Sequence, residues 1–351
     1  MKKIIILVIL LFPFKVNGLS ASSITVMDMD NNRVLYSYND SNPRLIASIT
    51  KIMTSLVTIN NSDVSKLITI DESVLKSYGS GIYVEVGEKI SLENLLYGLM
   101  LRSGNDAAIQ IANTVGGSME GFVDLMNETA ENIGMKKTSF VNSSGLEEND
   151  GTGNMSTSYD MALLMSEAMK NETFRKIVST KKHIVKTDYK TYVWYNKNKL
   201  LNTYEYCNGG KTGFTEKARR TLVTTASKDN MNLVIVTLND PNDFLDHKSL
   251  YEKYFNKYKS YKILDKDKEK FENKNYYIKN SKNLTLTNDE YKNIKKEVII
   301  YDNNVSDIVG VINVKLNNDL LAKEYIYEKV IKEKKKEKIT FWDKILNFFK
   351  I

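Results

Sequence analysis

The sequence predicts an α/β fold of the α+β type, in which an antiparallel sheet is flanked by helices and receives a helical insert. Three observations predict it. Strand-like patterns open the chain after residue 19, helical periodicity dominates its middle, and strand-like patterns return before residue 240. A sheet assembled from both ends of this segment, with helices between, follows from that order.

The elements are expected in this order: strands at residues 24–29 and 33–38, helices between residues 48 and 177, strands around residue 211 and at residues 220–226 and 232–238, and a helix at residues 243–254. Asp30, Asn31 and Asn32 predict the first turn, because Asp and Asn accept turn geometry. Asp229 and Asn230 predict the turn between the last two strands for the same reason.

Composition changes after about residue 261, where Lys and Asn become frequent and short β-prone runs appear. Four segments are therefore expected: a signal peptide at residues 1–18, a main domain at residues 19–260, a small all-β domain at residues 261–328, and a basic linker with an amphipathic helix at residues 329–351. We expect the small domain to be a spacer or a protein-contact module.

The first residues have the pattern of an export signal. Lys2 and Lys3 precede an apolar run at residues 4–14, and small residues follow near Gly18. The run is shorter than the roughly 20 residues that a membrane-spanning helix needs. We expect export and cleavage after Gly18, with an uncleaved anchor or a buried helix as the alternative.

The last residues are expected to bind a membrane surface. Five lysines lie between residues 332 and 338, where anionic head groups would attract them. In the following helix one arc carries the apolar side chains of Phe341, Trp342, Ile345, Leu346, Phe348 and Phe349. Such a helix lies in a membrane interface. The alternative is a terminal helix docked on its own domain.

Charge and composition exclude some classes of function. The formal net charge is +7 over 351 residues, and the main segment shows no basic stripe, so no nucleic-acid partner is expected. The chain has two histidines, His183 and His247, neither within a recognisable Ser-His-Asp pattern. It has no H-E-x-x-H motif and one cysteine, Cys207, so we expect no metal and no cofactor.

A Ser-x-x-Lys motif supplies the candidate nucleophile. Ser48 and Lys51 are three residues apart at the expected start of a helix, and positions i and i+3 lie on one helix face. A lysine kept neutral by burial can take the proton of a serine hydroxyl. The helix N-terminus favours the developing anion.

Two further motifs follow in order: Ser103 and Asn105 around Gly104, and the run of Lys211, Thr212 and Gly213. The Ser-x-x-Lys pattern also occurs at Ser73 and at Ser179, so its spacing alone is weak evidence. The ordered set of three motifs carries the prediction.

These stretches resemble the low-molecular-weight penicillin-binding proteins, the serine-type D-alanyl-D-alanine carboxypeptidases of peptidase family S11. The resembling segments are residues 47–54 (ASITKIMT), 85–88 (EVGE), 95–108 (LLYGLMLRSGNDAA) and 210–215 (GKTGFT). The resemblance implies a β-lactamase/transpeptidase-like domain followed by a small β domain. Gly104, where class A β-lactamases have Asp, is the usual residue of the carboxypeptidase subgroup.

The resemblance also implies a role for each motif residue. Ser48 would be the acylated nucleophile and Lys51 its general base, with Ser103 as proton relay and Asn105 as a ligand of the substrate amide. Lys211, Thr212 and Gly213 would bind the substrate's terminal carboxylate. The backbone N–H groups of Ser48 and Phe214 would form the oxyanion hole, a contact commonly worth about 3 kcal/mol per donor.

The chain departs from the family pattern at two places. Asn154 and Met155 stand where relatives commonly have a histidine, and Arg219 and Arg220 follow Ala218 where an Ala-Gly pair is usual. Residues 143–154 offer no deacylating glutamate of the β-lactamase kind. The resemblance therefore implies slow release of bound penicillin.

The expected activity is removal of the terminal D-alanine from peptidoglycan stem pentapeptides, with β-lactam antibiotics as inhibitors. The expected location is the outer face of a bacterial cytoplasmic membrane or the cell-wall space. The enzymatic alternatives are a D,D-endopeptidase or a β-lactamase on the same scaffold. The alternative from another class is a non-catalytic wall-binding protein.

Overall fold

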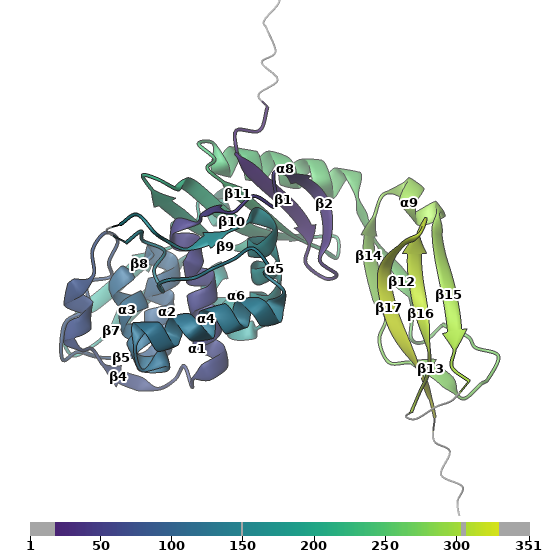
Figure 1. Ribbon diagram of the computed structural model, residues 1–351, viewed down its shortest axis with the longest axis horizontal. Helices are drawn as coiled ribbons and strands as arrows, with labels where there is room; N and C mark the ends of the chain where they lie inside the picture. Colours follow the sequence, from purple (N-terminus) through teal and green to yellow (C-terminus); the bar gives the residue numbers. More distant parts are fainter. Residues whose placement is uncertain (1–17, 149, 303–306, 330–351) are drawn as a thin grey trace, which may run out of the picture. The chain divides into compact units, whose positions relative to one another are not determined.

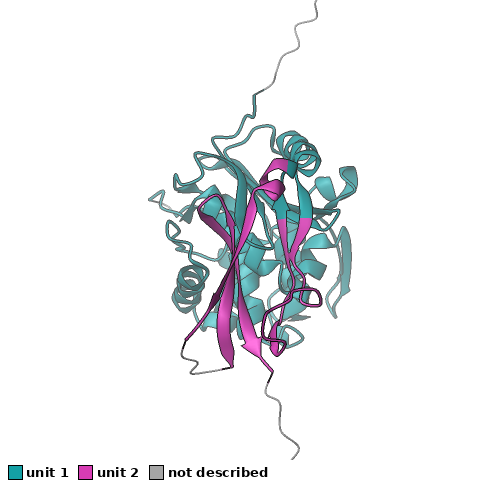
Figure 2. Cartoon of the chain, turned by 90° about the vertical axis from the view of Figure 1, so that its right-hand side faces the viewer, with its two compact units in different colours: residues 1–260, 285–288 teal, residues 261–284, 289–351 magenta. Residues whose placement is uncertain are grey.

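The computed structural model describes residues 18–148, 150–302 and 307–329. The chain divides into two compact units, one of residues 1–260 and 285–288 and the other of residues 261–284 and 289–351 (Figure 2). The predicted signal sequence before residue 18 and the predicted amphipathic helix lie outside the described residues. Within the described ranges no helix has the length and apolar character needed to cross a bilayer.

A five-stranded antiparallel sheet forms the centre of the first unit (Figure 1). Its spatial order is β2-β1-β11-β10-β9, so strands from both ends of the unit lie side by side. The strands are β1 (Ser23–Asp28), β2 (Arg33–Tyr38), β9 (Cys207–Thr215), β10 (Arg219–Lys228) and β11 (Met231–Leu238). The predicted sheet is therefore confirmed, and each strand begins or ends within a few residues of its expected position.

Both faces of this sheet are buried. Along β11, Leu233 and Ile235 belong to one apolar cluster, whereas Val234 and Val236 belong to another. This alternation follows from the two-residue period of a strand. The helix α8 (Asp243–Lys257) covers the first face with Tyr251 and its neighbours, and the helices of the insert cover the second (Figure 1).

The insert holds most of the helices, as the periodicity predicts. They are α1 (Lys51–Asn61), α2 (Leu92–Tyr97), α3 (Asn105–Gly116), α4 (Met119–Ile133), α5 (Ser158–Ala168), α6 (Glu172–Ser179) and α7 (Leu200–Thr203). Three small antiparallel ladders were not predicted: β3 (Arg44–Leu45) with β6 (Met155–Ser156), β4 (Leu67–Thr69) with β5 (Lys89–Ser91), and β7 (Lys182–Lys186) with β8 (Thr191–Tyr195). These strands are two to five residues long, too short for a period-2 pattern to stand out.

The start of the first helix differs from the prediction. Residues Ala47–Thr50 form a 3₁₀ turn, and α1 begins at Lys51 rather than at Ser48. Ala47 has φ 50°, a left-handed conformation that turns the chain sharply into the helix. Ser48 therefore lies in the tight turn that leads into α1.

The second unit is mainly a four-stranded antiparallel sheet of order β13-β17-β16-β15. These strands are β13 (Tyr276–Ile278), β15 (Ile294–Ile300), β16 (Ile308–Leu316) and β17 (Asp319–Glu328). A further ladder joins β12 (Lys259–Leu264) to β14 (Lys282–Leu286), and the helix α9 (Asn288–Lys292) precedes β15. The predicted C-terminal β structure is confirmed.

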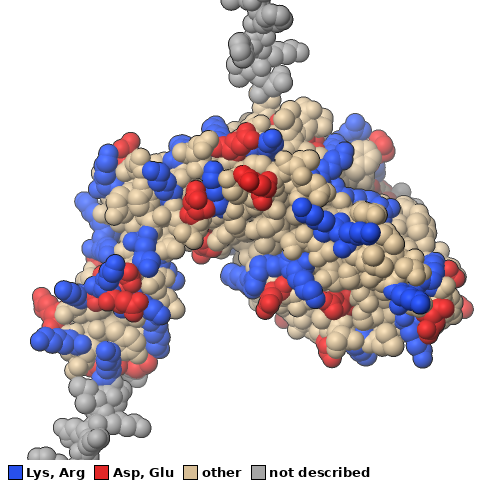
Figure 3. Space-filling view, turned by 180° about the vertical axis from the view of Figure 1, so that it is seen from behind, with Lys and Arg blue, Asp and Glu red and all other residues tan. Residues whose placement is uncertain are grey.

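Charged side chains are mixed across the molecular face drawn in Figure 3, where basic and acidic groups alternate over short distances. Salt bridges on the protein surface include Lys248 with Glu252 and Lys315 with Glu297. Exposed pairs of this kind contribute only about 0–1 kcal/mol each. They therefore contribute little to the stability of the fold.

Candidate active site

The structure places Ser48 and Lys51 in contact. The Lys51 Nζ donates to the Ser48 Oγ at 3.1 Å, across the junction of the 3₁₀ turn and α1. The same amine donates to the Asn105 Oδ1 at 2.8 Å and to the Ser144 carbonyl oxygen at 2.6 Å. The two other acceptors thus hold the buried amine beside the Ser48 hydroxyl.

Burial makes this amine easy to deprotonate. The Lys51 side chain is fully buried, and its pKa is lowered to about 7, first by desolvation and then by the charge of Lys197. The carboxylate of Asp106 acts in the opposite direction. The neutral form is therefore accessible near neutral pH, and a neutral amine can accept the proton of the Ser48 hydroxyl.

The second motif lies at a break between helices. A π-helical turn at Gly98–Arg102 ends at Ser103, whose φ of 66° is left-handed, and α3 begins at Asn105. The Ser103 side chain is buried, and its Oγ has no hydrogen-bond partner among the described residues. A hydroxyl left in this state beside a cleft is available to a ligand.

The third motif runs along β9 and approaches the nucleophile closely. A Cβ atom on Gly213 would lie 3.0 Å from the Ser48 nitrogen and 2.4 Å from the Thr221 Oγ1. Glycine at this position therefore permits β9 to pass directly beside the Ser48 turn. Lys211 is buried on the same strand, and desolvation together with the charges of Lys51 and Lys197 holds its pKa well below the usual value.

The motif residues border one cleft of about 550 Å³, within the size range of small-molecule sites. Its lining combines motif residues with residues that the sequence did not indicate: Ser48, Ser80, Ser103, Asn196, Lys197, Lys199, Thr212, Gly213, Phe214, Arg220, Asp243 and Phe244. All eight predicted site residues therefore lie in or directly behind this cleft.

A loop between β4 and β5 closes one side of the site and was missed. Asn105 donates from its backbone to the Ser80 carbonyl at 2.7 Å and from its side chain to the Tyr78 carbonyl at 2.6 Å. The Asp106 carboxylate accepts from the backbone N–H groups of Ile82 and Tyr83 at 3.0 and 2.6 Å. The one sequence signal for this loop was Asp106, which directly follows the Ser-x-Asn motif and binds the loop backbone.

A second loop supplies the carbonyl that holds Lys51. The Asn142 Oδ1 accepts from the backbone of Ser144 at 3.2 Å and of Gly145 at 2.8 Å, which shapes a tight turn. Asn154 links this turn to the nucleophile turn, because its Nδ2 donates both to the Asn142 carbonyl oxygen and to the Thr50 Oγ1, each at 2.9 Å. The departure from the family histidine therefore places a structural amide behind the nucleophile turn.

Gly145 allows the loop to pass beside the Ser48 turn. It has φ +84°, and a Cβ atom there would lie 2.0 Å from the Ala47 carbonyl oxygen. We predict that Gly145→Ala lowers the free energy of unfolding by about 2–5 kcal/mol, through the left-handed backbone and the clash together. Urea unfolding measures the loss. Gly117→Ala is the control, because Gly117 has φ +73° with nothing within 4 Å of the added atom. Equal losses in the two variants would contradict the close approach.

The second departure from the family pattern also has a structural consequence. Arg219 has φ 59°, a left-handed conformation that explains why glycine is usual here. Arg220 forms a bidentate pair with Asp243, with Nε–Oδ2 and Nη2–Oδ1 distances of 3.1 and 2.7 Å. The pair lies in the wall of the cleft and neutralises its own charge.

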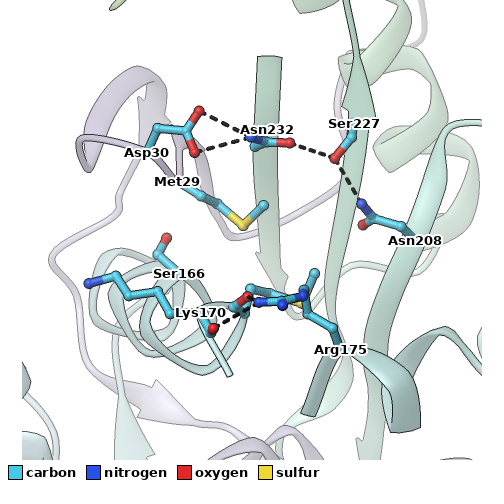
Figure 4. Close-up of a pocket in the computed structure, with 9 residues that line it drawn as sticks. Met29, Asp30, Ser166, Lys170, Arg175, Asn208, Ser227 and Asn232 are labelled. Atoms are coloured by element: carbon cyan, nitrogen blue, oxygen red, sulfur yellow. Dashed lines mark hydrogen bonds between the residues drawn. The ribbon is translucent and has the colours of Figure 1, made fainter. Parts of the chain in front are cut away.

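A separate cavity of about 350 Å³ contains none of the motif residues (Figure 4). Hydrogen bonds link the polar side chains on one side of it, from Asp30 through Asn232 and Ser227 to Asn208. On the other side Arg175 donates to the carbonyl oxygens of Met169 and Lys170. Its polar side chains are thus hydrogen-bonded within the protein.

The described residues include no group of three or more His, Cys, Asp or Glu side chains able to hold a metal ion. The chemistry available in the cleft is that of an activated serine. A serine beside a neutral lysine, facing a polar cleft, can form and break an acyl-enzyme. The site is therefore of the serine acyl-transfer class.

Comparison with known proteins identifies the family. The family model of peptidase S11, described as D-alanyl-D-alanine carboxypeptidase, matches residues 13–242, and the chain belongs to this family. It is 36% identical over 223 residues to the D-alanyl-D-alanine carboxypeptidase DacF of Bacillus subtilis (strain 168). That match covers 62% of this chain and 56% of the relative, so it spans little more than half of the relative's length.

Solved structures agree with the fold. A mutant of the Streptomyces K15 DD-transpeptidase is 30% identical with a TM-score of 0.64, and the match covers 68% of this chain and 99% of that chain. The D-alanyl-D-alanine carboxypeptidase DacD of Francisella tularensis has a TM-score of 0.70 at 24% identity, covering 89% and 93%. The second likeness concerns the fold alone and extends over most of the chain. The predicted fold class is confirmed.

Proposed function

We propose that the protein is a serine-type D-Ala-D-Ala carboxypeptidase that acts on peptidoglycan stem pentapeptides. The observation that carries this proposal is the 3.1 Å contact between the Ser48 Oγ and a buried Lys51 amine whose pKa is near 7. Membership of the S11 family supplies the substrate class.

In the proposed reaction the Ser48 Oγ attacks the carbonyl carbon of the penultimate D-alanine while Lys51 takes the hydroxyl proton. The peptide C–N bond then breaks, and the leaving D-alanine nitrogen receives a proton. Ser103 relays this proton, because it lines the same cleft as Ser48 and its Oγ has no hydrogen-bond partner among the described residues. Water next attacks the ester, which frees the shortened peptide and returns the proton to Ser48.

The remaining motif residues bind charge and position the substrate. The backbone N–H groups of Ser48 and Phe214 stabilise the tetrahedral oxyanion, at about 3 kcal/mol per donor. Lys211 and Thr212 face the terminal carboxylate, and Gly213 keeps their strand close to the nucleophile. An incoming carboxylate favours the charged form of Lys211, whose pKa burial has lowered.

The experiment that tests this function is product analysis. The purified protein is incubated with a stem pentapeptide, a cross-linked muropeptide and a β-lactam. We expect free D-alanine from the pentapeptide and a long-lived acyl adduct from the β-lactam. Cleavage of the cross-link without D-alanine release would favour an endopeptidase, and rapid β-lactam turnover would favour a β-lactamase. No reaction with any of them would favour a non-catalytic wall-binding protein.

The pH dependence of acylation follows from the lowered pKa of Lys51. Only the neutral amine accepts the serine proton, so we predict that kcat/KM for D-alanine release rises with pH through an apparent pKa of about 7. Stopped-flow acylation by a chromogenic β-lactam between pH 5.5 and 8.5 provides an independent measurement. A profile that is flat or falls over this range would contradict the role of Lys51 as a base.

The proposed location is the wall space of a bacterium, on the outer face of the cytoplasmic membrane. Its support is the family and the sequence, with export directed by residues 1–18 and surface binding by residues 329–351. A chain truncated after Lys338 should move from the membrane to the soluble fraction. A truncated chain that stays with the membrane would contradict the anchor.

A further inference from the structure

The cleft contains more positive charge than the reaction itself requires. The terminal carboxylate of the substrate has its proposed ligands on β9, at Lys211 and Thr212. Beyond these, the side chains of Lys197, Lys199 and Arg220 line the same cavity as Ser48. Asp243 is the one carboxylate in that lining.

The arginine does not contribute to this excess. Both of its hydrogen bonds in the wall go to Asp243, at 3.1 and 2.7 Å, so the pair is neutral as a unit. The Asp243 side chain is almost fully buried, which holds the pair in place. The Phe244 ring lies beside it, 5.7 Å from the Arg220 Cζ and 6.0 Å from the Lys199 Nζ.

The two lysines lack such a partner. Among residues 18–148, 150–302 and 307–329, neither Lys197 nor Lys199 lies within 4.0 Å of a carboxylate oxygen. Lys197 donates to the Ser80 Oγ at 3.2 Å, and Lys199 lies over Phe244. Asn198 between them is buried and donates to the Gly209 carbonyl at 3.1 Å, which fixes their backbone beside β9.

The two lysines differ in their relation to the catalytic groups. The charge of Lys197 lowers the pKa of both Lys51 and Lys211, so it also acts on the reaction. Lys199 makes no side-chain hydrogen bond to a motif residue in the described part of the chain, and its side chain is exposed at the cleft. An unpaired cation in a cleft concentrates the field on whatever enters.

We propose that Lys199, with Lys197 beside it, forms a subsite for a second carboxylate of the substrate, in addition to the terminal carboxylate. This inference rests on the proposed function and specifies its substrate class. The preferred stem peptide has an acidic group near D-Ala-D-Ala. Two sources offer that chemistry: a side-chain carboxylate on the residue before D-Ala-D-Ala, as in a diamino diacid, or the free α-carboxylate of a γ-linked D-glutamate one residue earlier.

Three synthetic substrates separate these sources. The neutral reference is Nα,Nε-diacetyl-L-lysyl-D-Ala-D-Ala, and the second peptide replaces the Nε-acetyl group with succinyl to add a side-chain carboxylate. The third places N-acetyl-γ-D-glutamyl before Nε-acetyl-L-lysyl-D-Ala-D-Ala. We expect kcat/KM of one acidic peptide to exceed that of the neutral peptide by about fivefold to tenfold, as for a partly shielded ion pair. The acidic peptide with the higher kcat/KM identifies which carboxylate of the stem peptide the subsite binds.

The variants Lys199→Gln and Lys199→Glu test the residue itself. The preference should disappear in the first and reverse in the second, mainly through KM, while kcat/KM of the neutral peptide stays within about twofold. The preference of the parent should also fall as salt rises from low to 0.5 M, because the Debye length shrinks to less than about 8 Å. Lys136→Glu is the control, because it makes the same charge change on an exposed side chain outside the cleft.

The outcomes separate this inference from the function beneath it. Equal kcat/KM for the three peptides, or equal loss on all three in Lys199→Gln, would overturn the subsite while leaving D-alanine release intact. Loss of preference in Lys136→Glu would overturn it too, in favour of a general charge effect. Release of no D-alanine from any peptide would overturn the proposed function and the subsite together.

Discussion

Replacing Ser48 by alanine should reduce D-alanine release from a pentapeptide by about 10⁴-fold or more, with binding of the peptide retained. Loss of a serine nucleophile commonly costs this much, because the other groups act through the bond that it forms. The Ser48 side chain contributes one hydrogen bond, from Lys51, so the fold should tolerate the change. Steady-state D-alanine release and calorimetric binding of the peptide measure the two effects.

Ser80→Ala is the matched control for this prediction. Ser80 lines the same cleft and accepts from Lys197 at 3.2 Å, but in the described part of the chain its side chain forms no hydrogen bond with Lys51. We expect it to keep activity within about tenfold, consistent with loss of one modest hydrogen bond. If Ser48→Ala keeps comparable activity, the nucleophile lies elsewhere.

Replacing Lys51 by methionine should slow acylation by about 10²–10⁴-fold, the range expected for loss of a general base. Methionine has similar length, so the buried site stays filled. The Asn105 and Ser144 acceptors lose a donor, at about 1–3 kcal/mol for a buried group left unpaired, and the cost of burying an amine is removed. Thermal unfolding should therefore change little compared with the rate.

The pH profile distinguishes this effect from a structural defect. In the parent the rate of acylation rises through the pKa of Lys51, and in Lys51→Met that limb should vanish. Lys66→Met is the control, because Lys66 is exposed and lies outside the cleft. A Lys51→Met enzyme that keeps both its rate and the pH limb would show that another group takes the serine proton.

The sheet could be predicted from sequence because its strands carry a signal at the right period. Alternation along residues 232–238 and a turn rich in Asp and Asn after β1 are local patterns. The ladder of β7 and β8 has the same alternation, with Tyr192 and Trp194 buried, but it is short and lies among helices. The tight turn before α1 depends on the left-handed backbone of Ala47. Alanine has no preference for that conformation, so the turn could not be predicted from the sequence.

The candidate site likewise combines residues that sequence patterns identify with residues that only the tertiary fold brings together. Ser48, Lys51 and Lys211 could be nominated from sequence because their spacing and order have chemical meaning. The Ser144 carbonyl could not, because a backbone group 93 positions away from Lys51 carries no sequence signature. Lys197 and Asp243 were missed for a similar reason, since tertiary folding alone brings them into the cleft.

The most direct test of the central claim is the location of the acyl group. The protein is incubated briefly with benzylpenicillin, quenched in acid and digested, and the modified peptide is sequenced by mass spectrometry. One penicilloyl group per chain, attached to Ser48 in the peptide that also contains Lys51, is the predicted result. Attachment to Ser103 or to any other residue, or the absence of an adduct in folded protein, would contradict the account.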